Sequence, residues 1–116
     1  MVQLTPQSRI LLALAPVDFR KGIDGLAAVC RQTVAQNPLD GAIYVFRNRT
    51  GTTLKRLCYD GQGYWLCTKR LSQGRLRWWP RADGTTVRLV ARELQVLLWN
   101  GCPDRAAMAA DWRQVA

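Results

Sequence analysis

The sequence contains no histidine, and this absence excludes several common kinds of chemistry. A chain without histidine cannot form a Ser-His-Asp triad, a Cys-His dyad or a zinc site with histidine ligands. Its four cysteines show no C-x-x-C spacing, so an all-cysteine zinc site has little support. No stretch approaches the roughly 20 apolar residues of a membrane-spanning helix. We therefore expect a cytoplasmic protein whose reduced cysteines pack as small apolar side chains.

Carboxylates are also scarce, since there are only 8 in 116 residues. They are Asp18, Asp24, Asp40, Asp60, Asp83, Glu93, Asp104 and Asp111. A metal-dependent nuclease or a DDE-type transposase needs several carboxylates that converge on one site. Asp18 and Asp24 are close in sequence, but each is also suited to capping or beginning a helix. Phosphate-loop and nucleophile-elbow motifs are absent. We expect no enzyme, no metal site and no cofactor, with a nuclease using Asp18, Asp24 and Asp60 as the less favoured alternative.

Positive charge, in contrast, is abundant. The chain has 17 lysines and arginines against 8 acidic residues, which gives a net charge of +9. Between residues 47 and 81 there are 9 cations and one anion, Asp60. The cations are Arg47, Arg49, Lys55, Arg56, Lys69, Arg70, Arg75, Arg77 and Arg81. Tyrosines and tryptophans share this stretch, and the mixture suits nucleic acid, because cations neutralise phosphates and flat rings stack on bases. A solvated charged face over an aromatic core is the alternative interpretation.

The hydrophobic pattern predicts one α+β domain over residues 1–101. A buried strand over residues 9–15 precedes a long helix that begins at Ile23, and a second helix covers residues 91–99. Segments rich in β-branched and aromatic residues predict further strands at 42–46, 53–59, 64–71 and 75–79, with 85–90 as a candidate addition. We expect an antiparallel β-meander of about four to six strands with the long helix on one face. Residues 102–116 are expected to form a tail or a short docked helix.

A turn between Asp60 and Gly63 suggests the register of one predicted hairpin. If these two residues pair, Cys58 faces Trp65 across the strands. Five side chains then share one face, namely Arg56, Cys58, Trp65, Cys67 and Lys69. A longer loop would instead place Cys58 opposite Cys67. Because neighbouring residues of a strand point to opposite faces, Trp65 and the residue before it cannot both be core on a sheet covered on one side. The core interpretation is favoured for Trp65.

Four ordered blocks of the sequence resemble a known family. The block from Val17 to Leu26, VDFRKGIDGL, resembles the N-terminal signature of the TnpB accessory proteins of the bacterial insertion sequence sixty-six family. Three further blocks agree with it: GAIYVFRNR at 41–49, LCYDGQGYWL at 57–66 and KRLSQGRL at 69–76. Cys58 and Cys67 depart from the pattern, since aromatic residues are expected there. The resemblance covers residues 8–101 and implies a small accessory protein that is encoded beside a separate DDE transposase and has no established catalytic residues.

Charge and resemblance together predict a non-catalytic accessory protein for DNA transposition, which binds DNA at the ends of an insertion sequence through a basic sheet surface. The expected nucleic-acid-binding residues are Arg20, Lys21, Arg47, Arg49, Lys55, Arg56, Lys69, Arg70, Arg75, Arg77, Trp78 and Arg81. The alternative is a protein-interaction module that docks on the cognate transposase without touching DNA. A homodimer is a further candidate assembly, because an edge strand or an exposed tryptophan invites pairing.

The segment from Asp18 to Gly22 has two interpretations. In the structural one, Asp18 hydrogen-bonds backbone amides at the start of a helix, and Gly22 permits a bend. In the functional one, Arg20 and Lys21 form an anion site with the free amides of a helix N-terminus.

Overall fold

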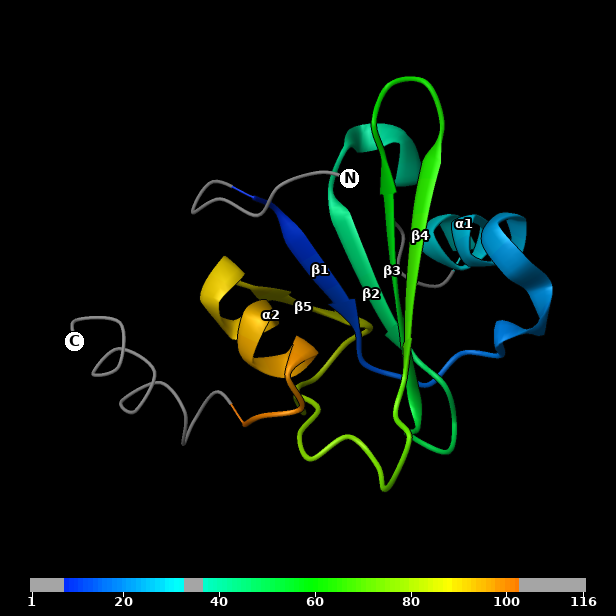
Figure 1. Cartoon of the computed structure of the whole chain (residues 1–116). Coiled ribbons are helices and arrows are strands. Elements are labelled where there is room, and N and C mark those ends of the chain that lie inside the picture. The colour runs from blue at the N-terminus through cyan, green and yellow to red at the C-terminus, as the bar shows by residue number, and fades with distance from the viewer. Residues whose placement is uncertain (1–7, 33–36, 103–116) are drawn as a thin grey trace.

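A five-stranded sheet with one helix on each face forms the body of the protein in the computed structural model (Figure 1). The structure describes residues 8–32 and 37–102. The strands and helices are β1 (Ile10–Ala13), α1 (Gly22–Gln32), β2 (Ile43–Arg47), β3 (Thr53–Tyr59), β4 (Tyr64–Arg70), β5 (Thr86–Leu89) and α2 (Ala91–Leu98). Two short 3-10 helices, η1 (Phe19–Lys21) and η2 (Pro38–Asp40), precede α1 and β2. These elements confirm the predicted α+β fold.

The sheet is mixed rather than a pure antiparallel meander. Its strand order is β4-β3-β2-β1-β5, and β1 pairs parallel with β2, whereas the other three pairings are antiparallel. The long connection through α1 allows this, because a parallel pair needs a crossover of a dozen or more residues. The meander prediction therefore holds for β2, β3 and β4 and is wrong for β1, which lies between β2 and β5.

The predicted hairpin register between β3 and β4 is confirmed. Asp60 N donates to Gly63 O at 3.1 Å, and Cys58 lies opposite Trp65. The longer-loop alternative is wrong, because Cys67 lies opposite Arg56 instead of Cys58. All four cysteines are thiols.

Both faces of the sheet bury apolar side chains, which explains why β2 is almost continuously apolar. The α1 side buries Leu26, Cys30, Tyr44, Phe46 and Leu57, among others. The α2 side buries Ile10, Leu12, Val45, Leu54, Leu94 and Leu97, among others. The core interpretation of Trp65 is wrong, because the tryptophan is 44% exposed.

The predicted strand over residues 75–79 is also wrong. Residues 71–85 join β4 to β5 without a strand. Trp78 and Trp79 instead pack from this connection against the α2-side core, and Trp79 Nε1 donates to Ala13 O at 3.0 Å. The apolar positions of the segment thus serve side-chain packing rather than strand pairing. The candidate strand over residues 85–90 is confirmed as β5, and it pairs with β1. The tail prediction concerns residues that, apart from Cys102, lie outside the described part of the chain.

Candidate nucleic-acid interface

Three segments meet at one end of the sheet, the lower end in Figure 1. They are residues 14–21 after β1, residues 47–52 from the last residue of β2 through the turn to β3, and residues 70–85 from the last residue of β4 to β5. Backbone hydrogen bonds join them: Val17 N donates to Arg47 O at 2.9 Å, and Leu76 N donates to Gly51 O at 2.8 Å. Segments far apart in sequence therefore form one continuous surface at this end of the sheet.

This end of the sheet carries six exposed arginines, which we call the arginine rim. They are Arg20, Arg49, Arg70, Arg75, Arg77 and Arg81. The three segments contain two carboxylates, Asp18 and Asp83. The rim therefore has a strong excess of positive charge, and all of its exposed cations described by the structure carry planar guanidinium groups suited to phosphate oxygens.

Two asparagines hold the backbone of the rim in place. Asn48 Oδ1 accepts from Thr52 N at 3.0 Å and so closes the β2–β3 turn. At the end of α2, Asn100 Oδ1 accepts from Arg77 N at 2.8 Å, and Asn100 Nδ2 donates to Arg75 O at 3.3 Å. Sequence reasoning missed both residues. The turn sequence around Asn48 could have pointed to it, whereas nothing local to Asn100 indicates a contact with residues more than 20 positions earlier.

Arg20 belongs to the rim, but its charge is partly offset by Asp18. Asp18 Oδ1 accepts from Arg20 N at 2.9 Å, and the Arg20 guanidinium pairs with Asp18 Oδ2 at 2.8 Å, which raises the pKa of Arg20. Gly22 has φ of +67°, which allows the bend between η1 and α1. The structural interpretation of this motif is confirmed for Asp18 and Gly22. The side chain of Lys21 lies outside the described part of the structure.

A cleft of about 620 Å³ separates η1 from the β2–β3 turn. Arg20 and Asp18 line one wall, and Arg49 lines the other. The cleft opens on the arginine rim, so an anionic group seated in it would lie between two guanidinium groups.

Arg47 was predicted to bind nucleic acid, but the structure places it partly inside the fold. Its guanidinium donates to Leu14 O at 3.0 Å and lies over the ring of Trp79, 5.3 Å from the centroid. Burial lowers the pKa of Arg47, and the nearby charge of Arg81 lowers it further. Arg47 therefore joins the end of β1 to the connection that carries the rim.

The remaining predicted residues do not lie on one surface. Lys55 lies on the α1 side, with its ammonium 5.0 Å from the ring centroid of Phe19. Arg56 and Lys69 share the opposite face, as the confirmed register requires. Trp78 is half-buried and packs against the α2-side core. The structure thus brings six of the twelve predicted residues together at the rim. Lys55, Arg56 and Lys69 lie elsewhere on the sheet, and Arg47 and Trp78 pack partly into the fold beside the rim.

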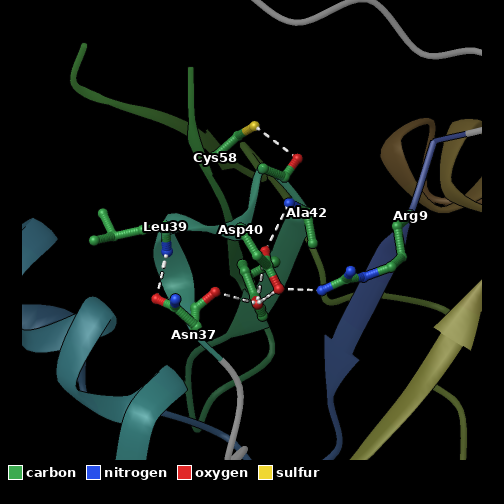
Figure 2. Close-up of polar contacts among 8 residues, drawn as sticks. Arg9, Asn37, Leu39, Asp40, Ala42 and Cys58 are labelled. Carbon is green, nitrogen blue, oxygen red and sulfur yellow. Dashed lines mark hydrogen bonds and ion pairs between the residues drawn. The ribbon is translucent and has the colours of Figure 1, made fainter. Parts of the chain in front are cut away.

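The opposite end of the sheet uses its charges within the fold (Figure 2). Asp40 accepts from Ala42 N at 2.9 Å and from the Tyr44 hydroxyl at 3.1 Å, and it pairs with Arg9. Burial and the Asp40 carboxylate raise the pKa of Tyr44. In the β3–β4 hairpin at this end, Asp60 accepts from two backbone amides and from Trp65 Nε1.

The thiols and carboxylates of the described residues do not assemble into a group of three or more metal-ligating side chains. Burial raises the pKa of Cys30 to about 12, and it also raises the pKa of Cys58. Both thiols therefore stay protonated near neutral pH. Asp18 and Asp60, two carboxylates of the alternative nuclease hypothesis, lie at opposite ends of the sheet.

Comparison with known proteins identifies the family. The family model described as IS66 Orf2 like protein matches residues 8–107. The uncharacterized protein y4hO of Sinorhizobium fredii (strain NBRC 101917 / NGR234) is 41% identical over 90 residues, which cover 78% of this chain and 77% of the relative. The uncharacterized protein y4jC of the same organism is 40% identical over 76 residues, 66% of this chain and 65% of the relative. No solved structure matches. Among the described residues, no helix is long and apolar enough to cross a membrane. The resemblance stated from four sequence blocks is thus confirmed, and the chain belongs to the transposition-associated family of IS66 Orf2-like proteins.

Proposed function

We propose that this protein is a non-catalytic accessory factor for transposition that binds DNA through the arginine rim. One observation carries the proposal: six exposed arginines belong to three segments that meet at one end of the sheet. A dense line of cations fits the regular negative charge of a DNA backbone, and binding gains free energy from the counterions that it releases. The family supplies the context, since it is associated with transposition, a reaction that takes place on DNA.

The rim is suited to phosphate contacts more than to base readout. Arginine guanidinium groups pair with phosphate oxygens on either strand of the DNA, and such contacts position a protein without reading the base sequence. The backbone of the rim is already held by Asn48 and Asn100, so binding would order few additional main-chain groups. We expect affinity that depends strongly on salt and only weakly on sequence.

A salt titration tests this function. Binding to a duplex from the ends of the element and to an unrelated duplex of equal length is measured by fluorescence anisotropy at several salt concentrations. If ~5 phosphates are contacted, log K falls against log salt with a slope of about −4.5. Absence of binding to either duplex at low salt would overturn the proposal. A large preference for the terminal duplex would mean that base readout contributes as well.

The alternative function is docking on the cognate transposase without DNA contact. Trp99 favours it, because this side chain is 85% exposed at the end of α2 and large aromatic rings often anchor protein interfaces. Copurification with the transposase after nuclease digestion distinguishes the two functions. A complex that survives digestion and is lost in Trp99→Ala supports docking, whereas a complex lost on digestion supports association through DNA.

A further inference from the structure

The β4 strand lies at one edge of the sheet, with half of its backbone groups turned outward. Two hydrogen bonds at the ends of the β3–β4 ladder show which opposite residues are hydrogen-bonded to each other. Asp60 N donates to Gly63 O, and Leu71 N donates to Thr52 O. Antiparallel pairs alternate between bonded and non-bonded, so every second residue of β4 turns its N–H and C=O away from β3. These outward residues are Tyr64, Leu66, Thr68 and Arg70.

The sequence of this strand is complementary to itself when it is reversed. It begins with two aromatic residues, Tyr64 and Trp65, and ends with two cations, Lys69 and Arg70. An antiparallel copy centred on Cys67 overlaps the whole strand and places Trp65 opposite Lys69 and Tyr64 opposite Arg70 of the second copy. A shift of two residues in either direction shortens the overlap and removes the aromatic rings from opposite the cations.

We propose that two copies of this chain associate through antiparallel pairing of their β4 strands, with Cys67 on the two-fold axis. In this register the outward residues Leu66 and Thr68 form a hydrogen-bonded pair, as the alternation in β4 requires. The aromatic and cationic side chains meet as cation–π pairs, which are attractive because the face of a ring carries negative partial charge. The product is one continuous ten-stranded sheet that covers the edge at which, among the described residues, no strand pairs with β4.

Both side chains of the pair of Trp65 and Lys69 already have partners within their own protomer. Trp65 Nε1 donates to Asp60 Oδ2 at 2.7 Å, which fixes a ring that is 44% exposed. The Lys69 ammonium donates to Leu98 O and lies 5.6 Å from the ring centroid of Trp99. The Trp65 ring is thus already restrained, whereas the Lys69 ammonium would have to move from Leu98 and Trp99 of its own protomer toward the Trp65 ring of the second copy.

The pairing has a consequence that rests on the proposed function. A two-fold axis through Cys67, perpendicular to the sheet, reverses the direction of the second sheet. The two arginine rims then lie at opposite ends of the strands of the ten-stranded sheet and face away from each other. Such a dimer would hold two DNA segments instead of gripping one from both sides.

The first test measures the mass of the nuclease-treated full-length protein by light scattering, without DNA. We expect about twice the monomer mass of 13.1 kDa. Thr68→Pro removes an outward N–H without breaking the ladder to β3, so it should yield monomer, whereas Thr68→Ala keeps that N–H and should remain dimeric. Added salt should strengthen the dimer, because it screens repulsion between two protomers of charge +9. DNA binding responds to salt in the opposite direction, so failure of one proposal is distinguishable from failure of the other.

The second test keeps the proposal falsifiable if Thr68→Pro does not fold. At the centre of the non-bonded pair, the two Cys67 residues come within disulfide range. Two thiols then lose two protons and two electrons to oxidised glutathione, which leaves as two reduced molecules. We expect a disulfide-linked dimer that persists in Cys102→Ser and is absent in Cys67→Ser. A wild-type protein that stays monomeric, or a dimer that shows no Cys67 cross-link, would overturn the proposal.

Discussion

The two ends of the sheet use charge in opposite ways. At the hairpin end, Asp40 and Asp60 accept hydrogen bonds from nearby backbone amides and side chains, so their charges are used in holding η2 and the β3–β4 turn. At the rim end, asparagines hold the backbone and the arginines extend into solvent. The net charge of a segment therefore does not locate a binding surface by itself. The rim arginines are available to a partner because uncharged side chains, those of Asn48 and Asn100, make the hydrogen bonds that hold the backbone there.

Reversing two rim charges should have the largest effect on DNA affinity. Arg75→Glu combined with Arg77→Glu removes two phosphate contacts and adds repulsion, so we expect affinity near 0.1 M salt to fall by about two orders of magnitude. The slope of log K against log salt should also become shallower by about 1.8. Fluorescence anisotropy with a labelled duplex measures both quantities.

The matched control places the same charge change away from the rim. Arg31 lies in the last turn of α1 and Arg88 lies in β5, and both side chains are exposed. Arg31→Glu combined with Arg88→Glu should weaken binding only through the change in net charge. If the control pair loses as much affinity as the rim pair, the rim is not the interface.

The reverse result is expected at the hairpin end. Asp40→Ala leaves the Tyr44 hydroxyl and Arg9 without a shared carboxylate, while the Tyr44 side chain is almost fully buried. We expect the free energy of unfolding to fall by about 2 kcal/mol, because the buried Tyr44 hydroxyl loses a charged hydrogen-bond partner. Urea denaturation measures this change. DNA affinity of the folded variant should equal that of the wild type, and a parallel loss of affinity would show that the two ends are not independent.

Much of the fold could be predicted because local rules decide it. The turn after Asp60 has glycines on both sides of Gln62, and this short connection alone fixes the register of β3 and β4. The parallel pairing of β1 with β2 was missed although the predicted order of strand, helix and strand is the one that such a pair needs. The pairing of β1 with β5 could not be predicted, because more than 70 residues separate these strands and no local pattern joins them. The segment at 75–79 has strand-like composition, but its tryptophans pack against the α2-side core.

Most arginines of the candidate site could be predicted from the sequence, but their arrangement in space could not. The cation cluster between residues 47 and 81 supplies five of the six rim arginines. Its members separate in space because alternate strand residues point to opposite faces, which moves Lys55 away from Arg56. Arg20 reaches the rim only because η1 lies across a cleft from the β2–β3 turn. Such long-range placement depends on tertiary packing rather than on local pattern.

Arg47 offers a smaller test of the division between structural and binding arginines. Arg47→Lys keeps the charge but loses the bond to Leu14 O and the stacking on Trp79, so we expect a loss of about 1 kcal/mol in unfolding free energy. Arg49→Lys is the matched control, because Arg49 is exposed and should leave stability unchanged. DNA affinity should hardly change in Arg47→Lys. A loss of DNA affinity without a loss of stability would show that Arg47 belongs to the binding surface.

The smallest expected effect concerns the pH dependence contributed by Asp60. Hydrogen bonds from Gln62 N, Trp65 Nε1 and Gly63 N lower the pKa of Asp60 below its ordinary value of 3.8. A carboxyl whose pKa is lower in the folded state stabilises the fold above its unfolded pKa, and that stabilisation is lost as the pH falls through the folded value. Asp60→Asn removes this titration, so its unfolding free energy should decline less than that of the wild type between neutral pH and pH about 3. Urea titrations at both pH values measure the difference. Equal declines in the two proteins would mean that the hydrogen bonds of the hairpin do not favour the ionised carboxylate, and the contrast between the two ends would then rest on Asp40 alone.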